Sequence, residues 1–529
     1  MKIKMKKKIN MKWLFLTVMF AFLGFVTTVS AAAITITVDN TKNLSTDANS
    51  YYVTNQGTII ISNVDAGDHL SAYKVLDVYY NQTSNVVSYD FTADFKAFLA
   101  QSTTYNTLSV QDYMTLTSGN IESGSTRTES TLDSLASAYA GYVKKNSITG
   151  TAMNTSGTTS TVTADAGTYL VLPTSTSKVY AVMVGNIGIS VVDGNWTLEN
   201  ATIVAKVSEA GIVNKSGGKT NVSAEIGEDI PFEISLTVPQ YPTNATNKKY
   251  IVTNTMSSGL TFSGFDSISV RDGETVLSLG MQSLPGVANV EDPESPETSD
   301  YYDTRRAILN SDGDIVGGIV VEGQKITITF YLEKVNSTSL KVTYNAKLNN
   351  NAVIGGNNSS SAQLEYSNDP YGTGTSITPI SSDGSGSVII KTYSLSIIKH
   401  ERNNETNLLA NATFEVYRDQ NLTDLQGTVT TGADGTVTIK GLKEGSYWLK
   451  EIKSPAGYSL INDAIQITIA DADATDGVIT AKIPNAKVGV LPITGGMGTI
   501  IFTVSGAVLM IGAIWFTFVY RKKNSRLEA

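Results

Sequence analysis

The chain of 529 residues contains no cysteine and only two histidines. Without cysteine there can be no disulfide, thiol nucleophile or cysteine-bound zinc, so the fold must rest on large cores or on another covalent link. His69 and His400 lie in different parts of the sequence. Neither a hydrolase triad nor a zinc site is supported, and we expect no cofactor, no metal site and no enzyme.

Charge is also scarce, at 16% of residues, and the formal net charge is −9. No basic patch of domain size is apparent, which argues against nucleic acid as a partner. Short alternating stretches such as TIIISNV, KITITFYL and AIQITIA are abundant, and this pattern is typical of half-buried strands. The length predicts two to four domains. We therefore expect an all-β chain of tandem β-sandwich domains outside the cell.

The two ends of the chain carry membrane-targeting patterns. Residues 1–31 combine a lysine-rich start, an apolar core and small residues before Ala31, as a cleaved signal peptide does; a retained membrane anchor is the alternative. Residues 497–520 are uncharged and long enough to cross a bilayer as a helix. The basic tail, residues 521–529, would stay cytoplasmic. The sequence thus predicts a secreted chain whose precursor is held in the membrane.

Between these ends we distinguish three regions, 32–207, 208–387 and 388–487. A helix is predicted in the first region within SYDFTADFKAFLAQ, because its phenylalanines fall at helical spacing. The run SSDGSGS before the last region reads as a flexible joint. The last region contains about seven short strands separated by turn residues, which suggests an immunoglobulin-like sandwich. Three tandem immunoglobulin-like domains are therefore expected.

A short motif within residues 488–496 precedes the predicted membrane helix. Its five residues form the pattern LPxTG: Leu491, Pro492, Ile493, Thr494 and Gly495. Followed by an apolar span and a basic end, it resembles the cell-wall sorting signals of Gram-positive bacteria. The resemblance implies that a sortase attacks the carbonyl of Thr494, breaks the Thr494–Gly495 peptide and forms an acyl-enzyme. The implied partners are a pilus-specific class C sortase, the housekeeping sortase and a peptidoglycan precursor.

The last region also contains YWLKEIKSPAGY, residues 447–458. This stretch resembles the E-box, YxLxETxAPxGY, of the B-type repeats of collagen-binding surface proteins, which are found in many pilins. Two positions depart from the pattern, Ile452 for Thr and Ser454 for Ala. Six other positions match, which makes the motif specific.

The E-box resemblance implies an isopeptide bond between Lys399 and Asn485, formed autocatalytically with Glu451 as the acid. Burial of an ammonium in an apolar core favours the neutral, nucleophilic amine. A buried protonated glutamate can polarise the amide that is attacked. An ordinary edge-strand carboxylate is the alternative for Glu451.

The middle region resembles the middle domain of pilin backbone subunits in the stretches VPQYP, TMSSGLTF, YNAKLN and LEYSNDP. The resemblance implies a second isopeptide bond, with Lys215 and Asn368 as its best-matching ends. The position of the assisting acid holds Asn254, which has no ionisable carboxyl group. An unbonded domain, or one that uses another acid, is the alternative.

The end of the first region, WTLENATIVAKVSE, partly resembles the pilin motif of pilus backbones. Trp196 fits and Lys206 takes the place of the reactive lysine, although Val204 and Ala205 replace Tyr-Pro and the spacing is one residue longer. The resemblance implies that Thr494 of one subunit is joined to Lys206 of the next. Lys215 is the runner-up acceptor, and a solvated strand lysine is the alternative.

Taken together, these patterns predict the structural subunit of a covalently polymerised cell-surface pilus in a Gram-positive bacterium. Its partners would be identical subunits, minor pilins and host surface proteins. The alternative is a wall-anchored monomeric adhesin or minor pilin that binds host matrix. The acidic stretch NSDGDIVGG, residues 310–318, lacks the glycine and glutamate of a calcium loop and predicts a polar hairpin turn.

Overall fold

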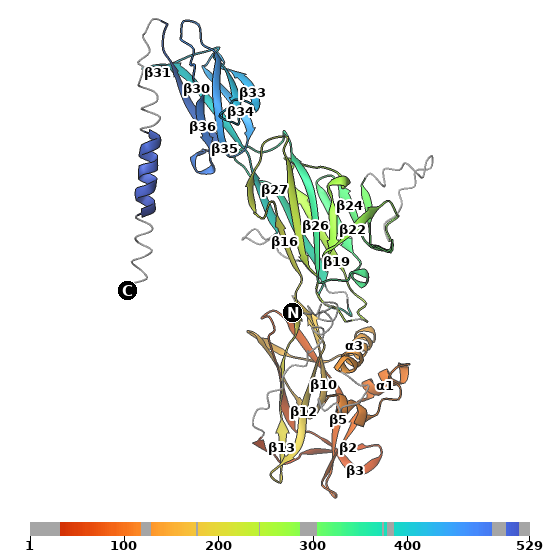
Figure 1. Ribbon diagram of the computed structural model, residues 1–529. Helices are drawn as coiled ribbons and strands as arrows, with labels where there is room; N and C mark the ends of the chain where they lie inside the picture. Colours follow the sequence, from red (N-terminus) through yellow and green to blue (C-terminus); the bar gives the residue numbers. More distant parts are fainter. Residues whose placement is uncertain are drawn as a thin grey trace, which may run out of the picture. The chain divides into compact units, whose positions relative to one another are not determined.

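The protein is described by a computed structural model that covers residues 32–117, 129–175, 178–242, 244–285, 304–372, 375–377, 386–488 and 504–517. It divides into two compact units (Figure 1). The first holds most of the chain up to Ile390, and the second begins mainly at Lys391 and also includes the short segments Ser223–Ile226 and Val353–Gly356. The strands confirm the all-β prediction. The finer division into three domains remains a prediction.

The first part of the first unit is built on two sheets. The larger has nine strands in the order β1-β13-β12-β10-β5-β3-β2, with β6 and β7 beside β5, and the smaller has the order β14-β4-β9-β8. The elements are β1 (Ala32–Ala33), β2 (Val38–Leu44), β3 (Asp47–Val53), β4 (Gln56–Ser62), β5 (His69–Asn81), β6 (Val86–Phe91), α1 (Ala93–Gln101), α2 (Val110–Thr117), α3 (Glu129–Lys145), β7 (Thr151–Ala152), β8 (Asn154–Ser156), β9 (Thr159–Asp165), β10 (Gly167–Ser175), β11 (Val179–Tyr180), β12 (Met183–Val192), β13 (Asn195–Glu199), β14 (Ala201–Val204) and β15 (Val207–Ser208).

The helices α1 and α3 lie beside β5 and β10 (Figure 1), around an apolar cluster to which both helices and both strands contribute. The helix predicted from phenylalanine spacing exists but is shorter than expected. Thr92 directly follows β6 and caps α1 by accepting a hydrogen bond from the backbone N–H of Phe95. Phe91 therefore belongs to β6, while Phe95 and Phe98 face the core. The helices α2 and α3 were not predicted.

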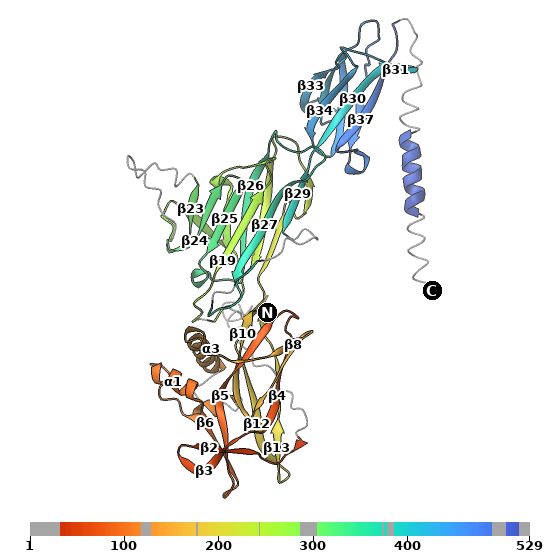
Figure 2. The same ribbon diagram turned by 180° about the vertical axis from the view of Figure 1, so that it is seen from behind.

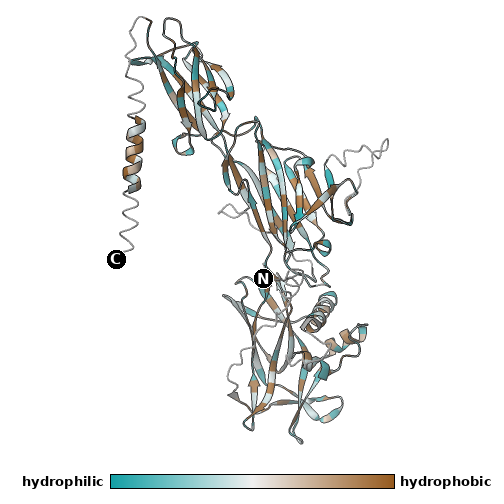
Figure 3. Ribbon diagram, viewed as in Figure 1, coloured by the Kyte–Doolittle hydropathy of each residue, from teal (hydrophilic) through white to brown (hydrophobic). Residues whose placement is uncertain are grey.

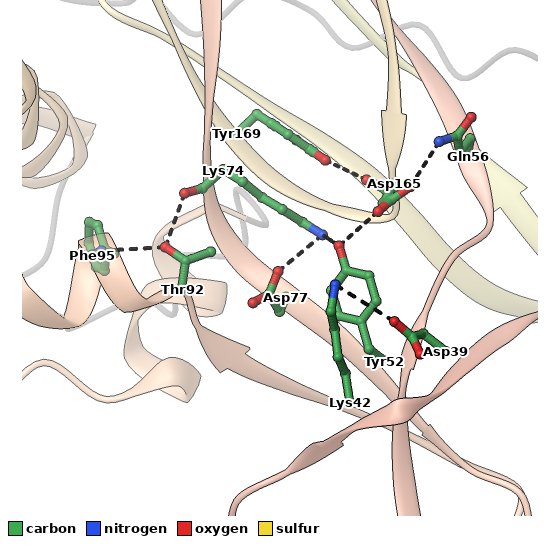
Figure 4. A network of polar contacts seen from close by, with 10 residues as sticks. All are labelled: Asp39, Lys42, Tyr52, Gln56, Lys74, Asp77, Thr92, Phe95, Asp165 and Tyr169. Carbon is green, nitrogen blue, oxygen red and sulfur yellow. Dashed lines mark hydrogen bonds and ion pairs between the residues drawn. The ribbon is translucent and has the colours of Figure 1, made fainter. Parts of the chain in front are cut away.

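A half-buried polar network surrounds Lys74 of β5 (Figure 4). Nζ of Lys74 donates to the hydroxyl of Tyr52 at 2.7 Å and pairs with Asp77 at 3.1 Å, and the Tyr52 hydroxyl donates to Asp165 at 2.8 Å. A bulge between Lys74 and Leu76 in the β5–β10 pairing brings Lys74 and Asp77 to the same side of the strand. Burial lowers the pKa of Lys74, against the attraction of Asp77.

The second part of the first unit is one 14-stranded sheet in the order β16-β18-β26-β21-β22-β23-β24-β25-β19-β27-β29-β17, with β20 beside β26 and β28 beside β27. Its long strands alternate apolar and polar residues, visible as alternating colour in Figure 3. The elements are β16 (Gly211–Lys215), β17 (Asn221–Ser223), β18 (Asp229–Thr237), β19 (Tyr250–Met256), β20 (Leu260–Phe262), η1 (Phe265–Ser267), β21 (Ser269–Asp272), β22 (Thr275–Gly280), β23 (Arg305–Leu309), β24 (Ile315–Glu322), β25 (Lys325–Phe330), η2 (Leu332–Lys334), β26 (Ser339–Leu348), β27 (Asn358–Ser367), β28 (Thr375–Ile377) and β29 (Ser387–Lys391).

The second unit is a sandwich of two four-stranded sheets (Figure 2). In one sheet β30 is flanked by β31 and β34 and pairs in parallel with β37; the other has the order β33-β32-β35-β36. The unit contains eight strands in place of the roughly seven expected. The elements are β30 (Tyr393–Glu401), β31 (Asn404–Leu408), β32 (Thr413–Tyr417), β33 (Leu425–Thr430), β34 (Thr436–Leu442), β35 (Gly445–Lys453), β36 (Ile465–Ile469), η3 (Asp471–Asp473) and β37 (Val478–Asn485).

Near the C-terminal end, residues 504–517 form a helix. Within the ranges given above, no helix has both the length and the apolar content needed to cross a membrane. The remainder of the span predicted at 497–520 lies outside the described residues. So do the predicted signal peptide, the LPxTG motif and the basic tail.

Candidate covalent cross-linking sites

Three residues singled out from the sequence meet in the core of the second unit. Lys399, Glu451 and Asn485 lie on β30, β35 and β37. In each strand, every second side chain faces the core. The three residues follow Ile397, Leu449 and Ile483 by two positions and therefore face inward as well. Because side chains alternate between the faces of a strand, the polar residue at each of these positions is forced into the core.

The side chains of Lys399 and Glu451 are fully buried, and Asn485 is buried as well. Nζ of Lys399 donates to Oδ1 of Asn485 at 2.5 Å and lies 3.2 Å from Oε1 of Glu451. Nδ2 of Asn485 donates to the two carboxylate oxygens of Glu451 at 3.1 and 3.2 Å. One carboxylate therefore contacts both the amine that would attack and the amide nitrogen that would leave.

Burial is the dominant influence on the lysine. It lowers the pKa of Lys399 to about 8, against the opposing attraction of Glu451, so a neutral amine is readily reached near neutral pH. The surroundings also fix the geometry. Nζ lies 5.4 Å from the ring centre of Phe414, and the backbone N–H of Ile461 donates to Oε2 of Glu451 at 2.8 Å. Sequence reasoning did not identify these two supporting contacts.

A second polar group, which we call the exit clasp, consists of Glu401, Asn407, Tyr458 and Lys487. Oε1 of Glu401 pairs with Nζ of Lys487 at 2.9 Å, and Oε2 accepts from the Tyr458 hydroxyl at 3.1 Å and from Nδ2 of Asn407 at 2.5 Å. The backbone N–H of Val488 donates to Gly457 at 2.9 Å. The clasp ties down the chain just after β37 and before the sorting motif.

The other predicted isopeptide pair is not brought together. Lys215 ends β16 and is exposed, opposite Glu233 of β18. Its neighbour Asn214 donates to the backbone carbonyl of Ser360, so this end of β16 lies near the start of β27. Asn368 follows the far end of β27, roughly 25 Å of extended chain beyond Ser360. The pairing was wrong because adjacent residues on a strand face opposite sides, and Asn214 occupies the inward position.

Lys206 lies in the break between β14 and β15, at the end of the first sheet system. It is half-buried, and its carbonyl oxygen accepts from the backbone N–H of Ala181 at 3.0 Å. The chain is extended on both sides of this residue but is not part of a strand at Lys206 itself. The position next to the start of β16 agrees with the location expected for the acceptor, but the role itself remains a prediction.

The stretch at residues 310–318 forms the polar turn expected between two strands, β23 and β24. Oδ1 of Asn310 accepts from the backbone N–H groups of Asp312 and Asp314 at 3.0 and 2.9 Å. Throughout the described ranges, no group of three or more acidic or histidine residues is arranged to hold a metal ion. The asparagine is thus used to close the hairpin.

Comparison with known proteins agrees with this geometry. A family model described as a prealbumin-like fold domain matches residues 393–485, the range that contains all three buried residues of the second unit. A second model, the LPXTG cell wall anchor motif, matches residues 483–525.

Relatives extend the likeness to the first unit. The trypsin-resistant surface T6 protein of Streptococcus pyogenes is 25% identical over 421 residues, which cover 62% of this chain and 71% of the relative. Fimbrial subunit type 1 of Actinomyces viscosus is 24% identical over 356 residues, or 56% of this chain and 62% of the relative. The solved T6 backbone pilin of serotype M6 Streptococcus pyogenes has a TM-score of 0.56 at 19% identity, over 82% of this chain and 99% of that one, and shows the shared fold.

The anchor motif, the prealbumin-like domain and the relatives make the chain similar to the cell-wall-anchored pilins of Gram-positive bacteria. They support a structural subunit of a surface pilus, similar to fimbrial subunits.

Proposed function

We propose that the chain is the shaft subunit of a pilus whose subunits are joined covalently by a sortase, and that each subunit is stabilised by an internal Lys399–Asn485 isopeptide bond. The observation that carries the proposed polymer is the LPXTG anchor match in a chain similar to backbone pilins. The contacts among the buried Lys399, Glu451 and Asn485 support the internal bond.

The contacts of Glu451 support the proposed internal bond. The neutral amine of Lys399 attacks Cγ of Asn485 and forms a tetrahedral intermediate. Glu451 accepts a proton from Nζ and delivers one to Nδ2, since Oε1 lies 3.2 Å from the first nitrogen and 3.1 Å from the second. Nδ2 then leaves as ammonia, and an amide joins β30 to β37. Glu451 acts once, within its own chain, so the protein is a building block rather than an enzyme that turns over substrate.

The polymer would form by two acyl transfers. A class C sortase takes the carbonyl of Thr494 as a thioester and releases the segment that begins at Gly495. Nζ of Lys206 in the next subunit attacks this thioester and frees the enzyme thiol. Each subunit thus offers a carbonyl at one end and an amine at another site, so the contact is heterologous and extends as a fibre. The housekeeping sortase would transfer the last subunit to a peptidoglycan precursor.

Mass spectrometry of material extracted from the cell wall tests this function. We expect a branched peptide in which Thr494 of one chain is linked to Lys206 of another. Peptides in which Thr494 is attached only to peptidoglycan fragments would show a wall-anchored monomer instead, such as an adhesin. A branch at another lysine, such as Lys215, would keep the polymer and correct the acceptor.

A further inference from the structure

A buried cluster of uncharged residues lies in the part of the first unit formed by residues 208–387. It consists of Asn214 on β16, Asn254 on β19, Tyr344 on β26 and Ser360 on β27. Asn214, Asn254 and Ser360 are fully buried, and Tyr344 is almost so. Within the described part of the chain, each hydrogen bond of this cluster joins an amide, a hydroxyl group or a backbone carbonyl.

The contacts connect the residues into a network. Nδ2 of Asn214 donates to the carbonyl of Ser360 at 2.9 Å, and Oγ of Ser360 donates to Oδ1 of Asn254 at 2.9 Å. Nδ2 of Asn254 donates to the hydroxyl of Tyr344 at 3.0 Å, which lies 2.6 Å from Oγ of Ser360. Oδ1 of Asn214, although buried, has no hydrogen-bond partner among the described residues.

Like the buried Lys399, Glu451 and Asn485 of the second unit, the residues of this cluster come from an early, a middle and a late strand. There the amine comes from the first strand, the acid from a central strand and the amide from the last strand of the sandwich, at Lys399, Glu451 and Asn485. Here the first strand supplies Asn214 and a later one, β27, supplies Ser360. Asn254 occupies the position where the sequence resemblance expects an acid.

With Asn214, Asn254 and Ser360 in these places, the cluster cannot form an isopeptide bond. The amide nitrogen of Asn214 shares its lone pair with its carbonyl and is a poor nucleophile, whereas a desolvated amine is a good one. Asn254 has no carboxyl group to accept and deliver a proton. Ser360 carries no side-chain carbonyl that an amine could attack. The cluster satisfies polar groups in the core but lacks the parts of an amide-forming site.

We propose that no covalent bond forms at this cluster, so that among the residues the structure describes the part formed by residues 208–387 is held without an internal cross-link and is the extensible element of the fibre. This inference rests on the proposed function, because force in the polymer would enter at Lys206 and leave at Thr494. Chain connectivity sends that force through residues 208–387 and then through the second unit. The Lys399–Asn485 bond would carry it across the second unit, so hydrogen bonds and packing alone resist it in the preceding part.

The first test is peptide mapping of the full chain by mass spectrometry. We expect a single cross-linked peptide, which joins Lys399 to Asn485 and is lighter by one ammonia, about 17 Da. Peptides that contain Lys215, Asn214, Asn254 or Ser360 should be linear and have unchanged mass. A cross-linked peptide involving any of these residues overturns the inference.

The second test is single-molecule stretching. Because the chain has no cysteine, Lys206→Cys with Val488→Cys gives unique attachment points at the two ends of this path. We expect one unfolding step that releases roughly 600 Å of chain, the extended length of residues 208–387. Stretching without this step overturns the inference.

Adding Asn485→Ala to this double-cysteine variant separates the two proposals. Loss of the internal bond should add a second step of roughly 300 Å, the extended length of residues 399–485. If the 600 Å step is present and Asn485→Ala changes nothing, the proposed bond in the second unit fails while the inference about residues 208–387 stands.

Discussion

Nζ of Lys399 lies 2.5 Å from Oδ1 of Asn485, its partner 86 positions later in the chain. The two residues are on parallel neighbouring strands, so the first and last strands of the second unit lie side by side (Figure 2). A bond here would close almost the whole unit into one loop. The chain-entropy model of cross-links assigns such a loop about 4–5 kcal/mol of stabilisation.

Glu451→Gln should prevent the internal bond, because glutamine cannot accept and deliver the proton that amide exchange requires. We expect the deficit of about 17 Da from the mass calculated for the sequence, one lost ammonia, to disappear, and the free energy of unfolding of the second unit to fall by about 4–5 kcal/mol. Intact-mass measurement and urea denaturation provide the readouts. The matched control is Glu401→Gln in the exit clasp, which should leave the mass deficit in place. An unchanged deficit in Glu451→Gln would exclude the role of this carboxylate.

The unbonded lysine should make stability depend on pH. In Asn485→Ala, Lys399 keeps a free amine whose folded pKa is lowered, as it is at about 8 in the native surroundings. In the unfolded chain the pKa of this lysine is about 10.4. Between about pH 8 and 10.4 the unfolded chain therefore binds more protons than the folded one, and the free energy of unfolding rises with pH. Urea denaturation across this range measures the slope. In the bonded protein the same nitrogen is an amide and does not titrate, so the slope should be absent; equal slopes in both proteins would contradict the bond.

Lys206→Ala should abolish polymerisation. Since the proposed acceptor amine is removed, surface extracts boiled in detergent should show the monomer in place of a ladder of high-mass species. Lys215→Ala is the control, because Lys215 is exposed nearby in the sequence and was the second candidate. If the ladder survives in Lys206→Ala and disappears in Lys215→Ala, the acceptor is Lys215 and not Lys206.

The network around Lys74 predicts a stability effect in the first part of the chain. Lys74→Met leaves the half-buried Asp77 without its cation at 3.1 Å and should cost roughly 2–3 kcal/mol, less than the loss of one partner of a fully buried pair. Lys42→Met removes an exposed partner of Asp39 at 3.7 Å and should change stability by less than about 1 kcal/mol. Thermal unfolding followed by circular dichroism compares the two variants. Equal effects would show that the network around Lys74 does not contribute to stability.

The sequence predicted the second unit better than the first because its strands are regular and its E-box fixes the register. Alternation alone places Lys399, Glu451 and Asn485 on the inner faces of their strands. The pair Lys215–Asn368 failed for the same physical reason: an error of one residue along a strand exchanges the inward face for the outward one. Alternation could not reveal that Asn214 is the buried residue.

The helices of the first part were harder to predict. The strand β6 ends at Phe91 and Thr92 caps α1, so the phenylalanine spacing continued across two different elements. The aromatic cluster that positions α2 and α3 is assembled from distant segments, among them Tyr113 and Tyr139, and spacing within one segment does not reveal such contacts. The exit clasp escaped prediction likewise, because Glu401, Tyr458 and Lys487 are far apart in the sequence.

The exit clasp sets a steric condition on any enzyme that cleaves the motif. Val488 is the last clasped residue, and Leu491 is only three positions later, which is at most about 10 Å of extended chain. An enzyme that binds Leu491 must therefore come within about 10 Å of the folded sandwich. Its binding groove has to be open at the end where the peptide enters, and a deep tunnel would collide with β37 before the leucine reached its pocket.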